Sequence, residues 1–467
     1  MEEKSYQLAI IGSGPGGYTA ALQAAKHGLK TVLIEKDSLG GTCLNWGCIP
    51  TKAYVRSAQV FTEAQSAADY GVKVKTAELD FPAVLARKDK IVQRLVKGID
   101  YLLKKAEVER INGEASFITA EKIKVKTAAE TVQIRADKII IATGSQPVIP
   151  SICGSDLPGI LNSKSLLSLT KLPDSLLIIG GGVIGLEFAF IFSQFGVEVT
   201  VLEYLDQLLP DFDSEISTEL NRAARRRKIK VKTGALVTKI VKSASGYQIS
   251  YQDKKERVQT KQAEQVLLAV GRKPYLAGLA PEKAGIELTK SGAIKVNNKM
   301  ESNISGIYAV GDVTGKNMLA HVAAEQALVA VANLSNNDQL KTMNYQAVPA
   351  AVFTEPEVAA VGLTESQAQA RNIAYQVGTF PFAASGKVMA MGSREGKIKI
   401  LAEASTGKII GASIIGIAAS DLIAELTLAV KEGLTFQTIA ATIHAHPTTA
   451  EVIHEAALEL GLGAIHA

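Results

Sequence analysis

The chain has 467 residues, too many for a single hydrophobic core, so two to four domains are expected. Its composition, 47% apolar and 21% charged, excludes a disordered, collagen-like or coiled-coil protein. Basic and acidic residues nearly balance, at 51 against 46, and the one dense basic run, "RAARRRKIKVK", is expected where a helix end leads into a strand, so a nucleic-acid partner is disfavoured.

The N-terminal stretch "MEEKSYQLAIIGSG" is typical of neither a signal peptide nor a transit peptide. No run reaches the ~18 uninterrupted apolar residues that a membrane span needs. Three cysteines in a chain of this length fit a reducing compartment, where disulfides do not serve as staples. We therefore expect a cytoplasmic protein with no membrane span.

The first predicted strand, residues 6–11, ends in the motif Gly12-x-Gly14-x-x-Gly17, and a helix and a second strand ending at Glu35 follow. The first glycine allows a tight turn, the second lets the backbone approach a pyrophosphate, and the third lets the helix pack on the strand. The helix N-terminus supplies N–H donors for phosphate. Glu35 is expected to accept hydrogen bonds from a ribose.

Two cysteines lie close together in "GGTCLNWGCIPTK". A regular helix would separate Cys43 and Cys48 by about 7.5 Å of rise, so they can pair only where the helix start is distorted, and Gly47 and Pro50 predict that distortion. A ring this small would stabilise the chain by only ~2 kcal/mol. Because a zinc site lacks its other ligands here, a redox dithiol is favoured over a staple or a metal centre.

The glycine unit is repeated 168 residues later, as Gly180-x-Gly182-x-x-Gly185 with Glu203 at the end of the next strand. The alternative is that the glycines serve only to pack helix on strand. It is disfavoured because it would have to hold for both copies of the motif. Glu203 is followed by "YLDQLLP", without a cation for a 2′-phosphate, which predicts NAD rather than NADP. Two dinucleotide sites indicate a resident flavin, an exchanging nicotinamide and hydride transfer.

Other segments add candidates between and after these units. A-x-G-x-x-P occurs at 142–147 and 269–274, where each nucleotide unit is expected to end. Asp312, after the strand in "GIYAVGD", is either a cofactor sugar contact or a turn residue. Cys153 is expected to be a small buried apolar side chain.

Glu187 lies on an apolar helix and needs a partner, for which Lys52 is the candidate. The alternative is that Lys52 is a surface lysine.

The C-terminal segment "HAHPTTAEVIHEAALELG" offers a base for the dithiol. His446 suits that work because a free cysteine has a pKa of about 8.5, and Glu451 could orient its ring. Thr448 and Glu451 also form a capping-box pattern for a helix that begins near Ala450, which would make Glu451 structural. The spacing alone leaves both interpretations open.

These motifs together resemble the pyridine nucleotide-disulphide oxidoreductases, most closely the members that oxidise dihydrolipoamide. The likeness runs nearly the whole length, with "GSGPGGY", "GGTCLNWGCIPTK", "ATGSQP", "GGGVIGLE", "AVGRKP", "YAVGDV", "LAHVAAEQ" and "HAHPTTAE" in the family's order. It implies an α/β fold with two Rossmann-like dinucleotide-binding domains and a C-terminal α+β dimerisation domain. The implied ranges are 1–147 and 272–345 for the FAD-binding domain with its central region, 148–271 for the NAD-binding domain and 346–467 for the interface domain.

The resemblance also implies residue roles. Cys43 would be the interchange thiol and Cys48 the charge-transfer thiol, and His446, oriented by Glu451, would be the acid–base residue supplied by the other subunit of a homodimer. Lys52 and Glu187 resemble the ion pair beside the flavin. The residues implied for FAD are Gly12, Gly14, Gly17, Glu35, Lys52, Gly113, Gly144, Asp312, Leu319, Ala320 and His321, and those for the NAD region are Gly180, Gly182, Gly185, Glu187, Glu203 and Gly271.

The implied reaction is the oxidation of dihydrolipoamide to lipoamide, with electrons passing through the Cys43–Cys48 pair and FAD to NAD. The implied partners are the lipoyl domain of an acyltransferase and a 2-oxo acid dehydrogenase complex. Two alternatives remain: a glutathione-reductase-like or other NAD(P)H-dependent disulfide reductase, and a flavoprotein subunit with a structural role in a multienzyme complex.

Overall fold

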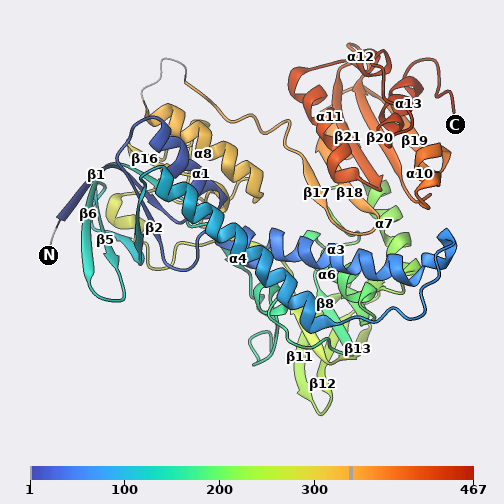
Figure 1. Cartoon of the computed structure of the whole chain (residues 1–467), viewed down its shortest axis with the longest axis horizontal. Helices are drawn as coiled ribbons and strands as arrows, with labels where there is room; N and C mark the ends of the chain where they lie inside the picture. The colour runs from blue at the N-terminus through green and yellow to red at the C-terminus, as the bar shows by residue number, and fades with distance from the viewer. Residues whose placement is uncertain (1–2, 336–339, 467) are drawn as a thin grey trace.

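The computed structural model describes residues 3–335 and 340–466. Residues 1–2, 336–339 and 467 lie outside the described part of the chain. They belong to the N-terminal stretch and to the domain ranges that the resemblance implies. The helices and strands form three groups (Figure 1): one from the blue, cyan and yellow segments, a green group below it, and an orange to red group at the C-terminal end.

The first group is built on a seven-stranded sheet with the order β3-β2-β1-β6-β5-β4 and with β16 paired to β6. The central strand β1 is parallel to β2 and β6, and its residues alternate between two cores, with Leu8 and Ile10 on one side and Ala9 and Ile11 on the other. A parallel strand covered on both faces reads as this continuous apolar run. The strands are β1 Glu3–Ile11, β2 Thr31–Glu35, β3 Glu109–Asn112, β4 Glu114–Phe117, β5 Lys122–Lys126, β6 Thr131–Ile141 and β16 Ile307–Ala309.

Helices of the first group cover this sheet and extend away from it. Helices α1 and α8 pack against each other, and their buried residues belong to the core that contains Leu8 and Ile10. Helices α3 and α4 run beside each other toward the second group (Figure 1). The helices are α1 Pro15–Lys26, α2 Gly41–Trp46, α3 Cys48–Gln65, α4 Phe81–Lys105 and α8 Ala320–Leu334.

The second group has a parallel sheet with the order β10-β9-β8-β14 and an antiparallel sheet β11-β12-β13. Helix α6 is apolar all round because it is covered on every side; Phe188, Phe190 and Phe192 are all buried, and α6 packs on α3. The elements are α5 Ser163–Leu166, β8 Ser175–Ile179, α6 Val183–Gln194, β9 Glu198–Leu202, α7 Ser214–Arg226, β10 Lys230–Lys232, β11 Leu236–Ser243, β12 Gly246–Gln252, β13 Val258–Ala263 and β14 Gln265–Leu268. The predicted placement of the basic run on a helix end and a strand is confirmed by α7 and β10.

The two A-x-G-x-x-P segments lie side by side. Their ends form β7, Ser145–Pro147, and β15, Arg272–Pro274, which pair with each other as an antiparallel two-stranded sheet. The chain therefore leaves the first group and returns to it through adjacent strands, and the second group is inserted between them.

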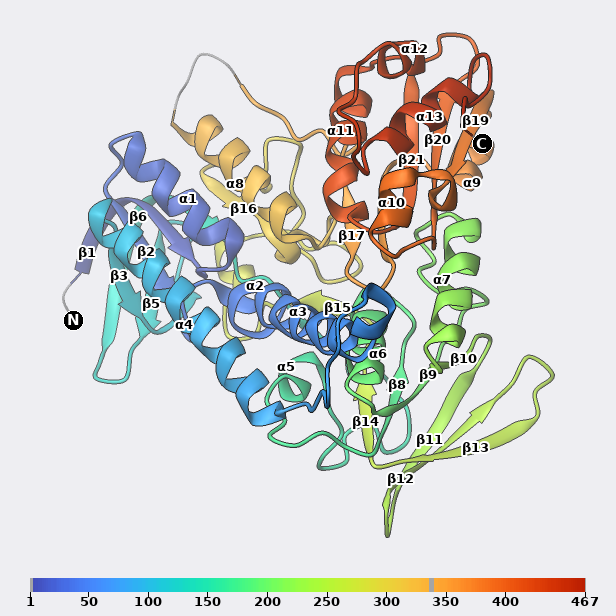
Figure 2. The same ribbon diagram turned by 45° about the vertical axis from the view of Figure 1, so that its right-hand side comes forward.

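The third group is an antiparallel sheet with the order β17-β18-β21-β20-β19. Helix α11 packs on β18 and β21, and α13 packs on β19 and β20 (Figure 2). The elements are β17 Ala350–Val352, β18 Glu357–Gly362, α9 Glu365–Ala370, β19 Tyr375–Pro381, α10 Gly386–Ala390, β20 Lys397–Glu403, β21 Ile409–Gly416, α11 Ala419–Glu432, α12 Phe436–Ala440 and α13 Glu451–Glu459. Among residues 3–335 and 340–466, every helix is too short or too polar to cross a bilayer.

The prediction for Cys153 is wrong, because its side chain is exposed. The backbone of Cys153 bridges to Lys239, and its carbonyl accepts the N–H of Ile240. Neighbouring residues of an extended segment point to opposite sides. Here Ile152 faces the core of the second group, so Cys153 faces solvent.

Candidate active site

The first glycine motif has the geometry that its sequence predicts. Gly12 has φ +99°, and a Cβ there would lie 2.4 Å from the carbonyl oxygen of Ala142. A Cβ on Gly17 would lie 1.8 Å from the carbonyl oxygen of Gly12, so only glycine lets α1 pack on the strand turn. Gly14, by contrast, has no atom within 4 Å of its ideal Cβ position. The turn therefore presents open backbone at the N-terminus of α1, where a pyrophosphate would bind.

The second motif repeats this geometry in another part of the molecule. Gly180 has φ +115°, a Cβ there would lie 2.4 Å from the carbonyl oxygen of Ala269, and a Cβ on Gly185 would lie 2.0 Å from the carbonyl oxygen of Gly180. Gly182 is open, as Gly14 is. The chain thus folds two equivalent cradles, one at α1 and one at α6.

The two strand-end glutamates share their hydrogen-bond pattern as well. Glu35 accepts the backbone N–H of Ser13 at 2.8 Å and that of Asp37 at 2.8 Å. Glu203 accepts the N–H of Gly181 at 2.5 Å and that of Leu205 at 2.7 Å, the positions 168 residues later. Each carboxylate is therefore fixed beside its own glycine turn.

The cysteine pair lies where one helix breaks into two. Helix α2 ends at Trp46, Gly47 has φ −145° and ψ −113°, and α3 begins at Cys48. A Cβ on Gly47 would lie 3.0 Å from the carbonyl oxygen of Thr42. The predicted distortion is confirmed, and it lies between the two cysteines, so Cys43 and Cys48 come from different helices.

The pKa values of the two thiols are shifted in opposite directions. Both cysteines are partly buried and reduced. A hydrogen bond from Cys43, opposed by burial and aided by the charge of Lys52, lowers the pKa of Cys48 to about 7. That same hydrogen bond, with burial, raises the pKa of Cys43. The first proton is therefore lost from Cys48, because its thiolate is stabilised by a donor and a cation.

The predicted partnership of Lys52 with Glu187 is confirmed. The ammonium group of Lys52 lies 2.8 and 2.9 Å from the two carboxylate oxygens of Glu187, and the Glu187 side chain is 6% exposed. Glu187 also accepts the backbone N–H of Phe353 at 3.0 Å, and Lys52 lies 4.2 Å from the centre of the Phe353 ring. The pair therefore joins α3 and α6 to the third group beside the thiolate.

Asp312 belongs to a polar chain that the sequence did not reveal. Ser145 donates a short hydrogen bond to Asp312, and Arg272 donates to the Ser145 hydroxyl and carbonyl, both at 2.8 Å. Burial lowers the pKa of Arg272, against the charges of Asp312 and Cys48. Gln326, fully buried, accepts the N–H of Gly311 at 2.6 Å. Only the pairing of the two A-x-G-x-x-P segments brings Ser145 and Arg272 together, so no local pattern signals them.

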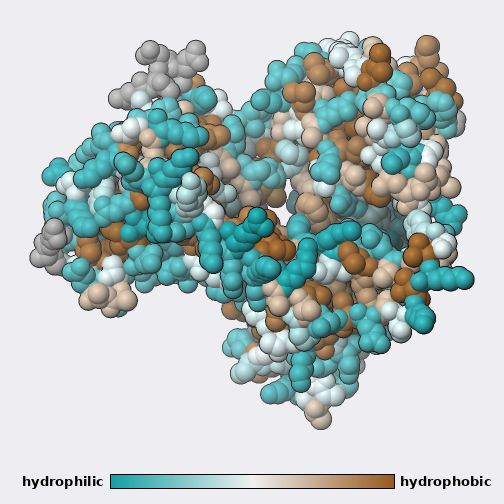
Figure 3. Space-filling model, in the orientation of Figure 1, coloured by the Kyte–Doolittle hydropathy of each residue, from teal (hydrophilic) through white to brown (hydrophobic). Residues whose placement is uncertain are grey.

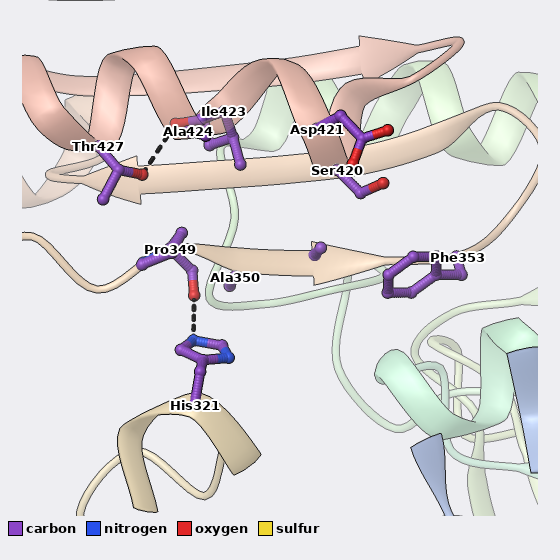
Figure 4. Close-up of a pocket in the computed structure, with 10 residues that line it drawn as sticks. His321, Pro349, Ala350, Phe353, Ser420, Asp421, Ile423, Ala424 and Thr427 are labelled. Atoms are coloured by element: carbon purple, nitrogen blue, oxygen red, sulfur yellow. Dashed lines mark hydrogen bonds between the residues drawn. The ribbon is translucent and has the colours of Figure 1, made fainter. Parts of the chain in front are cut away.

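A cavity of about 400 Å³ lies between α8, β17 and α11 (Figure 4). His321, in the first turn of α8, points toward β17, and its Nε2 lies 2.8 Å from the carbonyl oxygen of Pro349. Phe353, which contacts Lys52, lines the other end of the cavity. The cavity therefore connects the predicted flavin residue His321 to the neighbourhood of the Lys52–Glu187 pair.

The remaining predicted cofactor positions lie at turns of the backbone. Leu319 is the N-cap of α8 and Ala320 its first residue. Gly113 follows β3, and its N–H donates to the carbonyl oxygen of Glu35. Gly144 and Gly271, which precede β7 and β15, have φ +72° and +119° and no atom within 4 Å of an ideal Cβ.

His446 lies in the third group, away from the dithiol. Its Nδ1 is 2.8 Å from Glu451, and its side chain is 81% exposed. A hydrogen bond from His446 lowers the pKa of Glu451, and this carboxylate holds the imidazole ring through Nδ1. Among the described residues, no hydrogen bond or ion pair joins His446 to Cys43 or Cys48.

Glu451 binds both His446 and the loop before α13. One carboxylate oxygen binds Nδ1 of His446, and the other accepts the N–H of Thr448 at 2.9 Å. The predicted capping box does not form, because Ala450 is the N-cap of α13 and the Thr448 hydroxyl donates to the carbonyl oxygen of Ala445. Glu451 therefore fixes the histidine and the loop that carries it together.

Comparison with known proteins identifies the family. Residues 6–327 match the model described as pyridine nucleotide-disulphide oxidoreductase, and residues 348–457 match the dimerisation domain of the same family. The chain belongs to the pyridine nucleotide-disulphide oxidoreductases. The predicted fold class and family resemblance are thereby confirmed.

Similar pyridine nucleotide-disulphide oxidoreductases cover the whole chain. Dihydrolipoyl dehydrogenase of Chlamydia pneumoniae is 39% identical over 97% of each chain, and dihydrolipoyl dehydrogenase 2, mitochondrial, of Arabidopsis thaliana is 41% identical over 97% of this chain and 89% of its own. The structure of LpdA from Mycobacterium tuberculosis has a TM-score of 0.90 at 30% identity, covering 98% of this chain and 99% of its own. The Cu(II) complex of the HOCl-induced flavoprotein disulfide reductase RclA from Escherichia coli has a TM-score of 0.88 at 31% identity, covering 98% and 99%.

As a member of the pyridine nucleotide-disulphide oxidoreductases, the chain is a flavoprotein that uses FAD and NAD. Its residues fit two dinucleotides, because both glycine turns face open space at a helix N-terminus. The hydroxyl of Thr143, beside the first turn, is buried without a hydrogen-bond partner in the described part of the chain, as expected of a group that contacts a cofactor.

Proposed function

We propose that this chain is an NAD-dependent dihydrolipoyl dehydrogenase, which converts dihydrolipoamide and NAD to lipoamide, NADH and a proton. The observation that carries the proposal is the pair of cysteines at the break between α2 and α3, where the hydrogen bond from Cys43 and the charge of Lys52 lower the pKa of Cys48. The names of the similar full-length relatives support the choice of substrate.

The chain's own residues have separate roles in this proposal. Oxidised, Cys43 and Cys48 form a disulfide; a substrate thiolate attacks the sulfur of Cys43 and releases Cys48 as a thiolate. The second substrate thiol then attacks the mixed disulfide and releases lipoamide and the Cys43 thiolate, while His446 takes up the substrate proton. FAD, when bound, carries two electrons from the dithiol to NAD. The positive charge of Lys52 stabilises the Cys48 thiolate, and Glu187 and Phe353 hold Lys52 in place.

The cofactor residues are proposed for the two cradles. Gly12, Gly14, Gly17, Glu35 and Asp312, with the neighbouring residues named above, would hold FAD. Those around Gly182 and Glu203 would hold NAD. Glu203 would repel a 2′-phosphate, which supports the choice of NAD. The domain ranges given above are proposed with these sites, since the strands of each sheet fall within one of them.

We propose a homodimer in which His446 of one subunit serves the dithiol of the other. The exposed His446 ring and the match to a dimerisation domain support this arrangement. A lipoyl domain of a 2-oxo acid dehydrogenase complex is the proposed partner, and the cytoplasm, where thiols stay reduced, is the proposed location.

The test is NAD reduction by free dihydrolipoamide, measured at 340 nm with the purified holoprotein. NAD-linked turnover should be fast, should fall by at least 10³-fold in Cys43→Ser, and should exceed turnover with NADP. Cys153→Ser is the matched control, since Cys153 lies on the outer surface of the second group.

NADPH oxidation by glutathione disulfide, measured in parallel, tests the alternative enzyme. If only this reaction proceeds and Cys43→Ser abolishes it, the dithiol chemistry stands but the proposed substrate and nucleotide are wrong. A wild-type protein without turnover in either assay would contradict the enzyme and favour the structural subunit.

A further inference from the structure

The C-terminal tail folds back onto the helix that follows His446. Glu455, on α13, accepts three hydrogen bonds from this tail: from the backbone N–H of Ile465 at 2.8 Å, from the N–H of His466 at 3.2 Å, and from Nδ1 of His466 at 2.7 Å. The Glu455 side chain is 8% exposed. A buried carboxylate is costly unless it is paired and hydrogen-bonded, and the tail supplies both kinds of partner.

Two histidine–carboxylate pairs consequently lie side by side. Glu451 and Glu455 are one helical turn apart on α13, so their side chains are neighbours on the same face. Glu451 binds Nδ1 of His446 from the loop before the helix, and Glu455 binds Nδ1 of His466 from the tail after it. In both pairs the carboxylate accepts at Nδ1, and Nε2 has no hydrogen-bond partner within the part of the chain that the structure describes.

The second pair acts on the first through the helix that they share. Glu455 ties the tail to α13 one turn after Glu451, so both carboxylates are held on one face of the helix. The pKa of Glu451 is lowered first by its hydrogen bond with His446, and His466 contributes to the same shift. His466 itself does not contact the dithiol in the described chain, so its effect is indirect.

We propose that His466, held by Glu455, is a positioning residue for the His446–Glu451 pair, and that the C-terminal tail is thus part of the acid–base site. The inference rests on the proposed function, in which His446 handles the substrate proton. It assigns to the last described turn of the chain a role that the glycine and cysteine motifs do not reveal.

The experiment compares two reactions of the same holoprotein. Oxidation of dihydrolipoamide by NAD needs the acid–base histidine, whereas reduction of ferricyanide by NADH uses the nucleotide and flavin without it. In His466→Ala and in Glu455→Gln, we expect kcat of the first reaction to fall about tenfold. This loss is smaller than the roughly 10²- to 10⁴-fold rate enhancement of a positioned acid–base group, because these variants weaken the positioning and keep the group itself. The ferricyanide reaction should stay within about twofold of wild type.

Two further variants sharpen the comparison. His466→Asn restores an N–H donor near the Nδ1 position and should recover most of the lost turnover. Glu459→Gln is the matched control on the same helix, because Glu459 is exposed and, among the described residues, accepts only the N–H of Ala464. It should leave both reactions unchanged.

The outcomes separate this inference from the proposed function. Equal losses in both reactions, no loss in His466→Ala, or no recovery in His466→Asn would overturn the positioning role. In each case, loss of dihydrolipoamide turnover in His446→Gln would leave the proposed function standing. If His446→Gln keeps full turnover, the acid–base assignment fails instead.

Discussion

At the residue scale, the dithiol works because two chemically identical side chains lie in different surroundings. Cys48 is the first residue of α3, where helix N–H groups and Lys52 favour a negative charge, and Cys43 donates its proton toward it. The spacing of the cysteines predicts a redox pair, but it does not say which thiol ionises first. That assignment comes from the hydrogen bond of Cys43 and from Lys52, whose position depends on Glu187 in another group of the molecule.

The thiolate can be titrated directly. In the reduced protein, absorbance at 240 nm should rise as pH increases through about 7, because the pKa of Cys48 is lowered to about that value. Cys43→Ala removes the hydrogen bond that lowers it most, and Lys52→Met removes the stabilising charge, so both variants should shift the midpoint upward. Cys153→Ser should leave this step unchanged, and an unshifted midpoint in Cys43→Ala would contradict the assignment.

At the element scale, two short turns decide where dinucleotides can bind. In each copy the first and third glycines are required by contacts within the protein, while the second glycine faces open space. Within the six residues of each motif, the first and third glycines are therefore needed for folding, and the second is needed for binding. The hydrogen bonds of Glu35 and Glu203 extend the repeat beyond the glycines.

The two requirements predict different failures for the same substitution. Gly17→Ala places a methyl group 1.8 Å from the carbonyl oxygen of Gly12, so the protein should lose several kcal/mol of stability or fail to fold. Gly14→Ala has space and an ordinary backbone conformation, so the protein should fold but retain less FAD. The checks are thermal unfolding and the ratio of flavin to protein absorbance; full flavin retention in Gly14→Ala would contradict the cradle.

At the scale of the whole molecule, a buried ion cluster joins the second and third groups. Lys399, on β20, is 2% exposed and lies 3.6 Å from Asp213 and 3.7 Å from Glu215 of the second group, besides a short hydrogen bond to Glu365. Ser413 donates to Asp213 at 2.9 Å. The cluster fixes the third group, which carries His446, against the group that carries the second cradle. Figure 3 shows these parts as one continuous surface with mixed polar and apolar patches.

Removing the central cation should loosen this contact. Lys399→Met leaves the buried carboxylate of Asp213 without its cation and should cost about 3–5 kcal/mol of unfolding free energy, as broken buried ion pairs do. Lys295→Met is the control, because the Lys295–Glu287 pair is exposed and its loss should cost no more than about 1 kcal/mol. Urea unfolding of both variants gives the comparison, and equal midpoints would contradict the role of the cluster.

Local patterns in the sequence determine the features that depend on neighbouring residues. The glycine turns, the helix break at Gly47, the basic run and the redox pair depend mainly on residues close together in the sequence, and the sequence predicts each of them. Gly12 and Gly180 also pack against the distant residues Ala142 and Ala269. The 168-residue repeat extends this to two cradles. Such features are predictable because backbone sterics and helix geometry act over a few residues.

Tertiary structure decides what depends on distant segments. Lys52 meets Glu187 across 135 positions, Ser145 meets Arg272 through paired strands, and Cys153 is exposed because Ile152 takes the core side. The tail reaches Glu455 only after α13 has formed. These contacts form when sheets and helices pack together. The burial of apolar surface is not directional, so the local sequence does not show which polar side chains it will bring into contact.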